Sequence, residues 1–167
     1  KYLMPGLAEL HGHLMGDNDA LNERVLLLNV SRGITTIRGM LGHPSHLKLR
    51  ERVRRGELIG PTIYTSGPSL SGNTVKDEES ARRLVREQKA AGYDFLKIHP
   101  GMLRGPFDAL AATADEVGIR FAGHVPVDVG LHRALEAKYW SIDHLDGYVE
   151  ALLRDDAPVD PKQPGFF

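Results

Sequence analysis

The chain has 167 residues, of which 41% are hydrophobic, 26% charged and 7% aromatic, and this composition is typical of one globular domain. Its 21 basic and 22 acidic side chains give a formal net charge of −1, so no summed field attracts a polyanion, and we expect neither nucleic acid nor a membrane surface as a partner. The absence of cysteine excludes disulfides, thiolate catalysis and cysteine-ligated zinc, which leaves the eight histidines and the carboxylates as metal donors.

The start of the chain carries no targeting signal. No stretch reaches the roughly 18 consecutive apolar residues of a membrane-spanning helix, and no signal peptide is recognisable. The first residue is Lys1 rather than methionine, and the chain opens in the middle of what looks like a strand. We therefore expect the chain to be a piece of a longer polypeptide, and the sequence indicates no compartment.

Short apolar runs alternate with longer segments of helical periodicity, which predicts a parallel α/β fold. The predicted strands are residues 7–13, 35–38, 62–66, 95–99, 120–124 and 141–144. The predicted helices are residues 21–31, 45–55, 77–91, 106–117 and 127–137. The 3.6-residue period is clearest in 77–91, where Ala81, Val85 and Gln88 share one face.

Helix boundaries are marked by residues that suit helix ends. Glycines that tolerate positive φ follow three of the helical runs: Gly33, Gly92 and Gly118. Ser45 and Asp77 are predicted N-caps, and Pro106 suits a first helical turn.

About six βα units indicate either a doubly wound sheet or a TIM (β/α)8 barrel. A dinucleotide-binding sheet would carry a glycine-rich phosphate turn after its first strand, whereas this chain has Glu-Leu-His-Gly-His at residues 9–13. The barrel is favoured. Because a complete barrel needs about 250 residues, we expect residues 1–167 to form one incomplete barrel domain, with strands one to six but without the last strands.

The residues that carry chemistry gather at the predicted strand ends. His11 and His13 are two positions apart, so both project to the same face of the first strand, about 6.6 Å apart along the backbone. Lys97, His124 and His144 lie at the ends of the fourth, fifth and sixth strands. In a barrel the C-terminal strand ends share one face, so these side chains are expected to meet there and bind metal.

Five segments carry a resemblance to a known family. They are Leu-Met-Pro-Gly-Leu-Ala-Glu-Leu-His-Gly-His at 3–13, Gly-Ile-Thr-Thr-Ile-Arg at 33–38, Tyr-Asp-Phe-Leu-Lys-Ile at 93–98, Gly-His at 123–124 and Ser-Ile-Asp-His at 141–144. In this order, and over nearly the whole chain, they resemble the amidohydrolase superfamily in its imidazolonepropionase-like and prolidase-like branch.

The resemblance implies a metal-dependent hydrolase that cleaves C–N bonds of a small-molecule substrate on a distorted barrel. It implies that His11 and His13 hold a first divalent ion, that a carboxylated Lys97 bridges, and that His124 and His144 hold a second. Zinc is the expected metal, because imidazoles suit zinc and two cations can make hydroxide near neutral pH.

The sequence departs from the family pattern beyond the sixth strand. The family has an Asp at the end of an eighth strand as ligand and general acid/base, and no motif here supplies it. Asp155, Asp156 and Asp160 lie in a proline-rich loop and are interpreted as solvated. The flanking β-sandwich is also missing. We therefore expect this chain to be inactive, or nearly so, by itself.

Other residues have weaker signals. The proposed substrate contacts are His99, Arg38 and Tyr148, with Ser66 also at a strand end. His43 and His46 lie in the loop after the second strand, where solvation and substrate binding both stay open; His132 is expected on a helix surface. Tyr139 and Trp140 are expected to pack between barrel and helix.

Three alternatives stay open. Lys97 at a strand end also suits a Schiff-base lyase or aldolase, which needs no metal but leaves the histidines unexplained. A non-catalytic barrel remnant would explain the missing eighth-strand Asp. A single-metal site would use only some of the histidines. The substrate and the oligomeric state are not indicated by the sequence.

Overall fold

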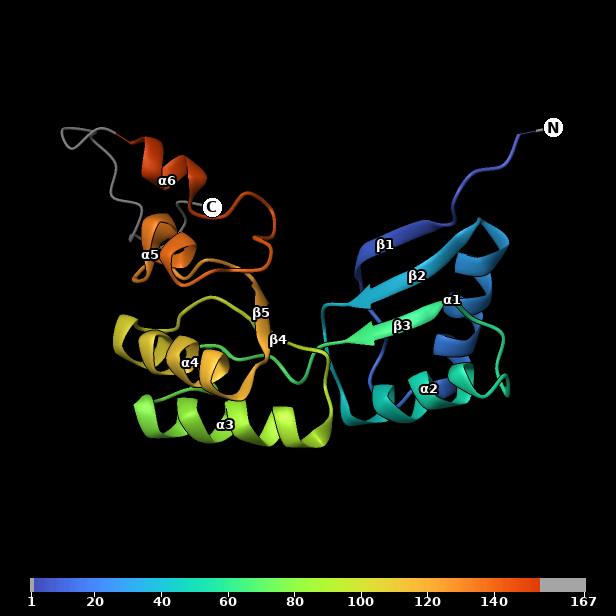
Figure 1. Ribbon diagram of the computed structural model, residues 1–167, viewed down its shortest axis with the longest axis horizontal. Helices are drawn as coiled ribbons and strands as arrows, with labels where there is room; N and C mark the ends of the chain where they lie inside the picture. Colours follow the sequence, from blue (N-terminus) through green and yellow to red (C-terminus); the bar gives the residue numbers. More distant parts are fainter. Residues whose placement is uncertain (1, 154–167) are drawn as a thin grey trace. The chain divides into compact units, whose positions relative to one another are not determined.

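A computed structural model describes residues 2–153 of the chain, in which five strands and six helices follow one another (Figure 1). The predicted α/β class with parallel strands is confirmed, and the described strands do not close a barrel. No helix within these residues is long and apolar enough to span a bilayer. The chain divides into two compact units, Lys1–Pro68 with Ala91–Phe95 and Ser69–Ala90 with Leu96–Phe167, called here the first and second units.

The first unit is a parallel sheet with helices between its strands. Its elements are β1 (Leu7–Gly12), α1 (Asp19–Ser31), β2 (Ile34–Gly39), α2 (Pro44–Arg54) and β3 (Thr62–Thr65). The strand order is β1-β2-β3, both pairs are parallel, and the β1–β2 register is irregular between Glu9 and Gly12. β1 is therefore an edge strand of this sheet, and its last residues depart from regular pairing directly before His13.

The core of the first unit joins the sheet to its two helices. The buried side chains that form it are Leu14, Leu26, Ile37, Leu49 and Ile63. Each is at most 3% exposed, so truncating one of them would remove a large share of its apolar contacts. Asp94 links α2 to β3 through hydrogen bonds, because its carboxylate accepts from the Arg50 side chain at 2.7 Å and from the Thr65 backbone N–H at 2.8 Å.

The start of α2 differs from the prediction that Ser45 is its N-cap. His43 is the N-cap, Pro44 occupies the first turn, and the Ser45 N–H donates to His43 Nδ1 at 3.3 Å. The fully buried His46 completes a capping box, because its Nδ1 accepts a hydrogen bond from the His43 N–H at 3.2 Å. Its Nε2 donates to the Met15 carbonyl at 3.1 Å. His43 and His46 therefore have structural roles: together they cap α2, and His46 connects this helix to the loop after β1.

The second unit contains α3 (Glu78–Ala91), β4 (Phe95–Ile98), α4 (Arg104–Val117), β5 (Arg120–Gly123), α5 (Gly130–Glu136) and α6 (Tyr148–Leu152), with Ala91 and Phe95 at its boundary with the first unit. β4 and β5 form a two-stranded sheet (Figure 1). α3 forms as predicted because it buries Ala81, Val85 and Gln88, and the Asp77 carboxylate caps it by accepting from the Ser80 N–H at 2.7 Å.

The core of the second unit contains an aromatic cluster. Phe107 of α4 and Phe121 of β5 are at most 5% exposed, and their rings meet edge to face with centroids 6.0 Å apart. Tyr139 packs against both rings, at 5.9 and 5.0 Å. The predicted packing role of Tyr139 is thereby confirmed, while Trp140 is 46% exposed, with the Arg120 guanidinium 5.1 Å from its ring centroid.

The sixth predicted strand, residues 141–144, is wrong as a strand. Only Ile142 bridges to Gly123, supported by a Gly123 N–H to Ser141 carbonyl bond of 3.2 Å and an Asp143 N–H to Gly123 carbonyl bond of 2.9 Å. His144 and Leu145 then take positive φ angles of 55° and 61°. Because a strand requires negative φ, the extended backbone ends there and a turn begins.

Smaller differences occur at element ends. The predicted helix 127–137 is shortened to Gly130–Glu136, because the N–H groups of Val129 and Gly130 both donate to the Pro126 carbonyl in a turn. The short α6 was not predicted. Gly33, Gly92 and Gly118 all have positive φ, as the sequence predicts.

Gly123 is required at the end of β5. Its φ is 132°, and a Cβ at this position would lie 2.2 Å from the Ile98 carbonyl oxygen. The two strands can therefore approach closely only because residue 123 lacks a side chain. The next residue is His124, so this glycine also fixes where that histidine leaves the strand.

We expect Gly123→Ala to destabilise the second unit more than Gly118→Ala. Gly118 also has positive φ but has no atom within 4 Å of its would-be Cβ, so its substitution should cost only the conformational term of about 1–2 kcal/mol. Gly123→Ala adds a backbone clash to that term. Urea unfolding of the two variants measures the difference, and equal free energies of unfolding would contradict it.

We expect stability to fall in mild acid through His46. Burial lowers the pKa of His46 below its usual 6.5, so the folded state favours the neutral ring. This contribution is complete above about pH 6.5 and is lost as the pH falls through the lowered folded value, because the unfolded chain then binds the extra proton. Accordingly, the stability deficit of His46→Asn relative to wild type should shrink between about pH 7.5 and pH 5. The exposed His132→Asn is the control, and an equal change in both variants would contradict the prediction.

Candidate functional site

The first unit presents two histidines at the end of β1. His11 is the fifth residue of the strand and His13 follows its last residue, Gly12. Their ring centroids lie 5.1 Å apart, so the two rings gather on one side, as the i, i+2 spacing predicts. Gly12 is buried between them, and a Cβ there would lie 2.6 Å from the Ile37 side chain. The core thus requires glycine at the middle position of this His-Gly-His segment.

The second unit contains a buried ion pair at the middle of β4. The Lys97 amine donates to the Asp143 carboxylate, and the two residues are 1% and 5% exposed. Two opposite charges removed from water need each other, because removing one partner leaves an uncompensated charge in the core. Lys97 is a site residue predicted from the sequence, whereas its partner Asp143 is not.

His124 follows β5 and is held at two points. Its Nδ1 lies 2.6 Å from a carboxylate oxygen of Asp146, and its backbone carbonyl accepts from the Tyr139 hydroxyl at 2.8 Å. Burial, together with the charges of Asp143 and Asp146, raises the pKa of the Tyr139 hydroxyl. Tyr139 therefore stays protonated and remains a donor to the His124 backbone.

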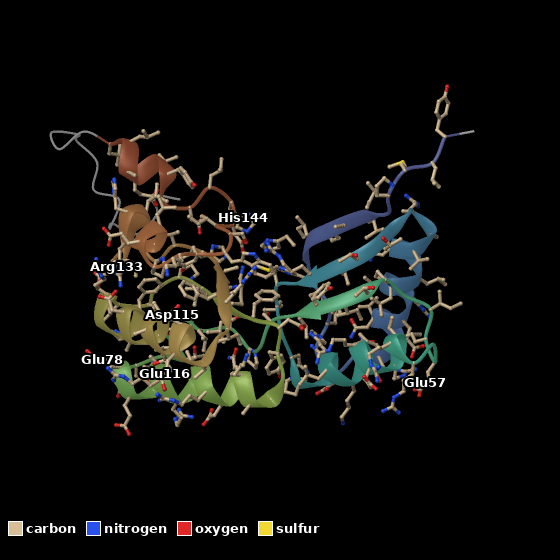
Figure 2. All side chains as sticks on the ribbon, viewed as in Figure 1. Glu57, Glu78, Asp115, Glu116, Arg133 and His144 are labelled. Carbon is tan, nitrogen blue, oxygen red and sulfur yellow. The ribbon has the colours of Figure 1, made fainter. Side chains whose placement is uncertain are left out.

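His144 lies on the loop between α5 and α6 (Figure 2). Its ring centroid is 5.2 Å from that of His124, and one of its ring nitrogens lies within 4.8 Å of an Asp143 carboxylate oxygen. The side chain is exposed, whereas Asp143 is buried. The loop therefore places the His144 imidazole beside the His124 ring and close to the Asp143 carboxylate.

Each unit contains a pair of imidazoles whose ring spacing is compatible with a shared divalent metal. Two imidazoles that share a tetrahedral zinc ion at Zn–N distances of about 2.0–2.1 Å have ring centroids about 5 Å apart. The His11–His13 and His124–His144 pairs, at 5.1 and 5.2 Å, both satisfy this spacing. Neutral imidazoles with a carboxylate are ligands that suit zinc.

The weaker candidates have different surroundings. The His99 ring meets the His124 ring edge to face at 5.0 Å, so His99 belongs to the same cluster. The Arg38 side chain donates to the Leu10 carbonyl at 2.7 Å and lies over the Phe95 ring, which ties it to the first unit's sheet. Tyr148 is 40% exposed at the start of α6.

Two further candidates complete the set. Ser66 is fully buried, and its hydroxyl has no hydrogen-bond partner within the described residues. The aspartates at positions 155, 156 and 160 lie outside the part of the chain that the structure describes.

Two aspartates of the site were missed, although the sequence contains a signal for them. Asp143 and Asp146 flank His144 at positions −1 and +2. Histidines that bind metals commonly donate their second nitrogen to a carboxylate, so acidic residues beside a predicted ligand are candidates for that role. Which histidine each aspartate contacts depends on the turn at residues 143–147 and is not readable from spacing.

The chain is similar in fold to several solved structures. No family profile and no curated protein sequence matches the chain. Among solved structures, bottromycin amidohydrolase has a TM-score of 0.76 and 26% identity, over 86% of this chain and 33% of that one. A candidate prolidase from Bifidobacterium longum has a TM-score of 0.69 and 27% identity, over 83% of this chain and 39% of that one.

A third structure, a prolidase complexed with N-methylphosphonate-L-proline, has a TM-score of 0.67 but only 19% identity, over 83% of this chain and 47% of that one, and supports the fold alone. The chain spans a third to about two fifths of the length of the first two structures. Structure thereby confirms the resemblance of this chain to the amidohydrolase superfamily that its sequence motifs indicate.

Proposed function

We propose that this chain is part of a metal-dependent amidohydrolase that cleaves the C–N bond of an amide, lactam or dipeptide-like small molecule. The proposal includes a partial (β/α)8 barrel as the scaffold of residues 1–167. The amidohydrolase and prolidase-type names of structures 26–27% identical to the chain support the hydrolase class. The observation that carries the proposal is the spacing of two imidazole pairs, His11 with His13 and His124 with His144. In each pair the ring centroids are as far apart as those of two histidines that bind one ion.

The proposed metal ligands are His11 and His13 for one ion and His124 and His144 for a second, and a carboxylated Lys97 is the proposed further ligand. When bound, such ions would supply a metal-activated water and polarise the scissile carbonyl. The chain's own part is to hold four neutral imidazoles with one nitrogen each directed at a cation. His99, in edge-to-face contact with His124, is the proposed substrate contact at this cluster.

Carboxylation of Lys97 would change its relation to Asp143. As an ammonium, Lys97 neutralises the buried Asp143. A carboxylated Lys97 would instead place a second negative charge beside that carboxylate, which is unfavourable at low exposure without positive charge close by. Carboxylation and metal binding are therefore proposed to occur together.

The same ion pair weighs against a Schiff-base mechanism. A nucleophilic amine must be deprotonated and open to a carbonyl carbon. Lys97 is 1% exposed and donates to a carboxylate, which favours the ammonium form. Reduction with borohydride in the presence of a carbonyl compound would trap an adduct on Lys97 only if the lyase alternative were correct.

We expect the purified protein to bind close to two equivalents of zinc. Lys97→Ala should preferentially lose the second equivalent, and His11→Ala should weaken the first, because each removes a ligand of the proposed site. Elemental analysis after dialysis against a weak chelator measures both. His132→Ala, an exposed helix residue, is the control. One equivalent in wild type would support a single-metal site, and unchanged zinc content in both variants would refute the ligand assignment.

We further expect the 167-residue chain to hydrolyse amides slowly or not at all. Two described carboxylates of the second unit are already engaged, Asp143 with Lys97 and Asp146 with His124, so neither is proposed as the general acid/base. Zinc-loaded protein can be assayed on N-acyl amino acids, lactams and dipeptides that end in proline. Turnover equal to that of a longer chain carrying the expected eighth-strand Asp would contradict this expectation.

A further inference from the structure

The second unit contains a pocket at the start of β5, at the opposite end of this strand from His124. It has a volume of about 460 Å³ and is lined by the last turns of α4, the first residues of β5 and the segment that follows α5. Pockets for small molecules typically measure about 300–1,000 Å³. We propose that this pocket binds a small molecule that combines a planar aromatic ring with a carboxylate. The inference makes no use of the histidines and is independent of the proposed function.

The first step concerns the apolar part of the pocket. Ile119 and Phe121 of its inner wall are at most 6% exposed, and Tyr139 packs against Phe121 with ring centroids 5.0 Å apart. Trp140 continues this wall outward, and almost half of its surface is exposed. Partly exposed tryptophan beside an apolar wall is typical of contact residues in recognition sites, because its ring offers a large, rigid stacking surface. The wall therefore suits an aromatic ring.

The second step concerns the charges at the rim of the pocket. Within residues 2–153, Arg120 and Lys138 form no ion pair, and the Arg120 guanidinium lies 5.1 Å from the Trp140 ring centroid. Asp115 of α4 also lines the pocket (Figure 2), so two positive charges and one negative charge leave a net charge of +1. The other described arginines of this unit all pair with a carboxylate of the chain: Arg82, Arg83, Arg86, Arg104 and Arg133.

The position of the guanidinium indicates which anion fits. Its planar set of N–H donors matches the two oxygens of a carboxylate, and it lies at the ring of Trp140. A carboxylate bound by Arg120 would therefore hold its own substituent close to the indole. The net positive charge of the rim favours an anion over a neutral molecule of the same shape.

The third step concerns the backbone of Lys138. The first four helices are each followed by a glycine of positive φ: Gly33, Gly56, Gly92 and Gly118. At the corresponding position after α5 stands Lys138, with a φ of 61°. This conformation is strained for a residue with a side chain, and such strain is characteristic of functional sites. It favours a role for the ammonium group at the pocket.

A lysine at the end of a helix also interacts favourably with the helix dipole, so Lys138 has an alternative explanation. The two explanations differ in the effect of glycine. If lysine is present for the pocket, Lys138→Gly relieves the backbone and stabilises the fold while it weakens ligand binding. If lysine is present for the helix end, the same substitution removes a favourable charge and leaves ligand binding unchanged.

The test is a titration of the 167-residue chain with benzoate, followed by the fluorescence of Trp140, the one tryptophan of the sequence. Benzamide has the same ring without the charge, and acetate has the carboxylate without the ring. EDTA is present throughout, so benzoate cannot report binding to a metal ion. Arg120→Gln and Lys138→Gly remove the two rim cations. Arg82→Gln is the matched control, because Arg82 is an exposed arginine of α3 in the same unit.

We expect benzoate to saturate the Trp140 signal with a dissociation constant of about 1 mM, as suits so small a ligand. Benzamide and acetate should bind at least about 10-fold more weakly, because each lacks one of the two recognised groups. Arg120→Gln and Lys138→Gly should each weaken benzoate binding about 3- to 10-fold, and Arg82→Gln should not change it. The urea midpoint of Lys138→Gly should lie above that of wild type.

Three results of the titration would overturn the proposal: no saturable signal, equal affinities for benzoate and benzamide, or an affinity unchanged in both Arg120→Gln and Lys138→Gly. A lower urea midpoint with unchanged affinity in Lys138→Gly would assign this lysine to the helix end and would also contradict it. A Trp140 signal that depends on protein concentration instead of benzoate would assign the pocket to contacts between copies of the chain, against the proposal.

Discussion

The buried ion pair between Lys97 and Asp143 is the interaction on which the second unit's site depends. Both residues are almost completely excluded from water, and breaking such a pair by removing one partner typically costs about 3–5 kcal/mol. The pair fixes Asp143 against β4, and Asp143 is the first residue of the turn that continues through His144 to Asp146. A charge in the centre of the strand therefore determines where the following imidazole and carboxylate lie.

The turn at residues 143–147 explains why a predicted strand is replaced by irregular backbone. One residue, Ile142, pairs with β5, and then the left-handed angles of His144 and Leu145 redirect the chain. Each such residue costs about 1–2 kcal/mol relative to ordinary backbone. Together the two costs are of the same order as the loss that would follow if Asp143 left Lys97. The strain is thus sustained by the ion pair, with the bond between Asp146 and His124 as a second support.

Periodicity predicted most of the fold, and strand-end position predicted much of the candidate site. The five strands and the helices between them were located from their apolar runs and helical periodicity, as in α3, which buries Ala81 and Val85. The i, i+2 rule brought His11 and His13 together correctly. The sequence could not indicate the roles of His43 and His46, because their bonds to each other and to Met15 depend on how the loop after β1 folds back on α2. Asp143 and Asp146 were missed for the same reason: a turn of positive φ, invisible in the pattern, selects their partners.

Under the proposed function, the charges of the second unit would link carboxylation of Lys97 to metal binding. With Lys97 as an ammonium, its positive charge offsets Asp143, and Asp146 is satisfied by the N–H of His124. Carboxylation removes one positive charge and adds one negative charge, so the same small volume would contain three anionic groups among neutral imidazoles. A buried cluster of that kind is stable only beside compensating cations, and divalent ions bound by the imidazoles are the compensation that these side chains can provide.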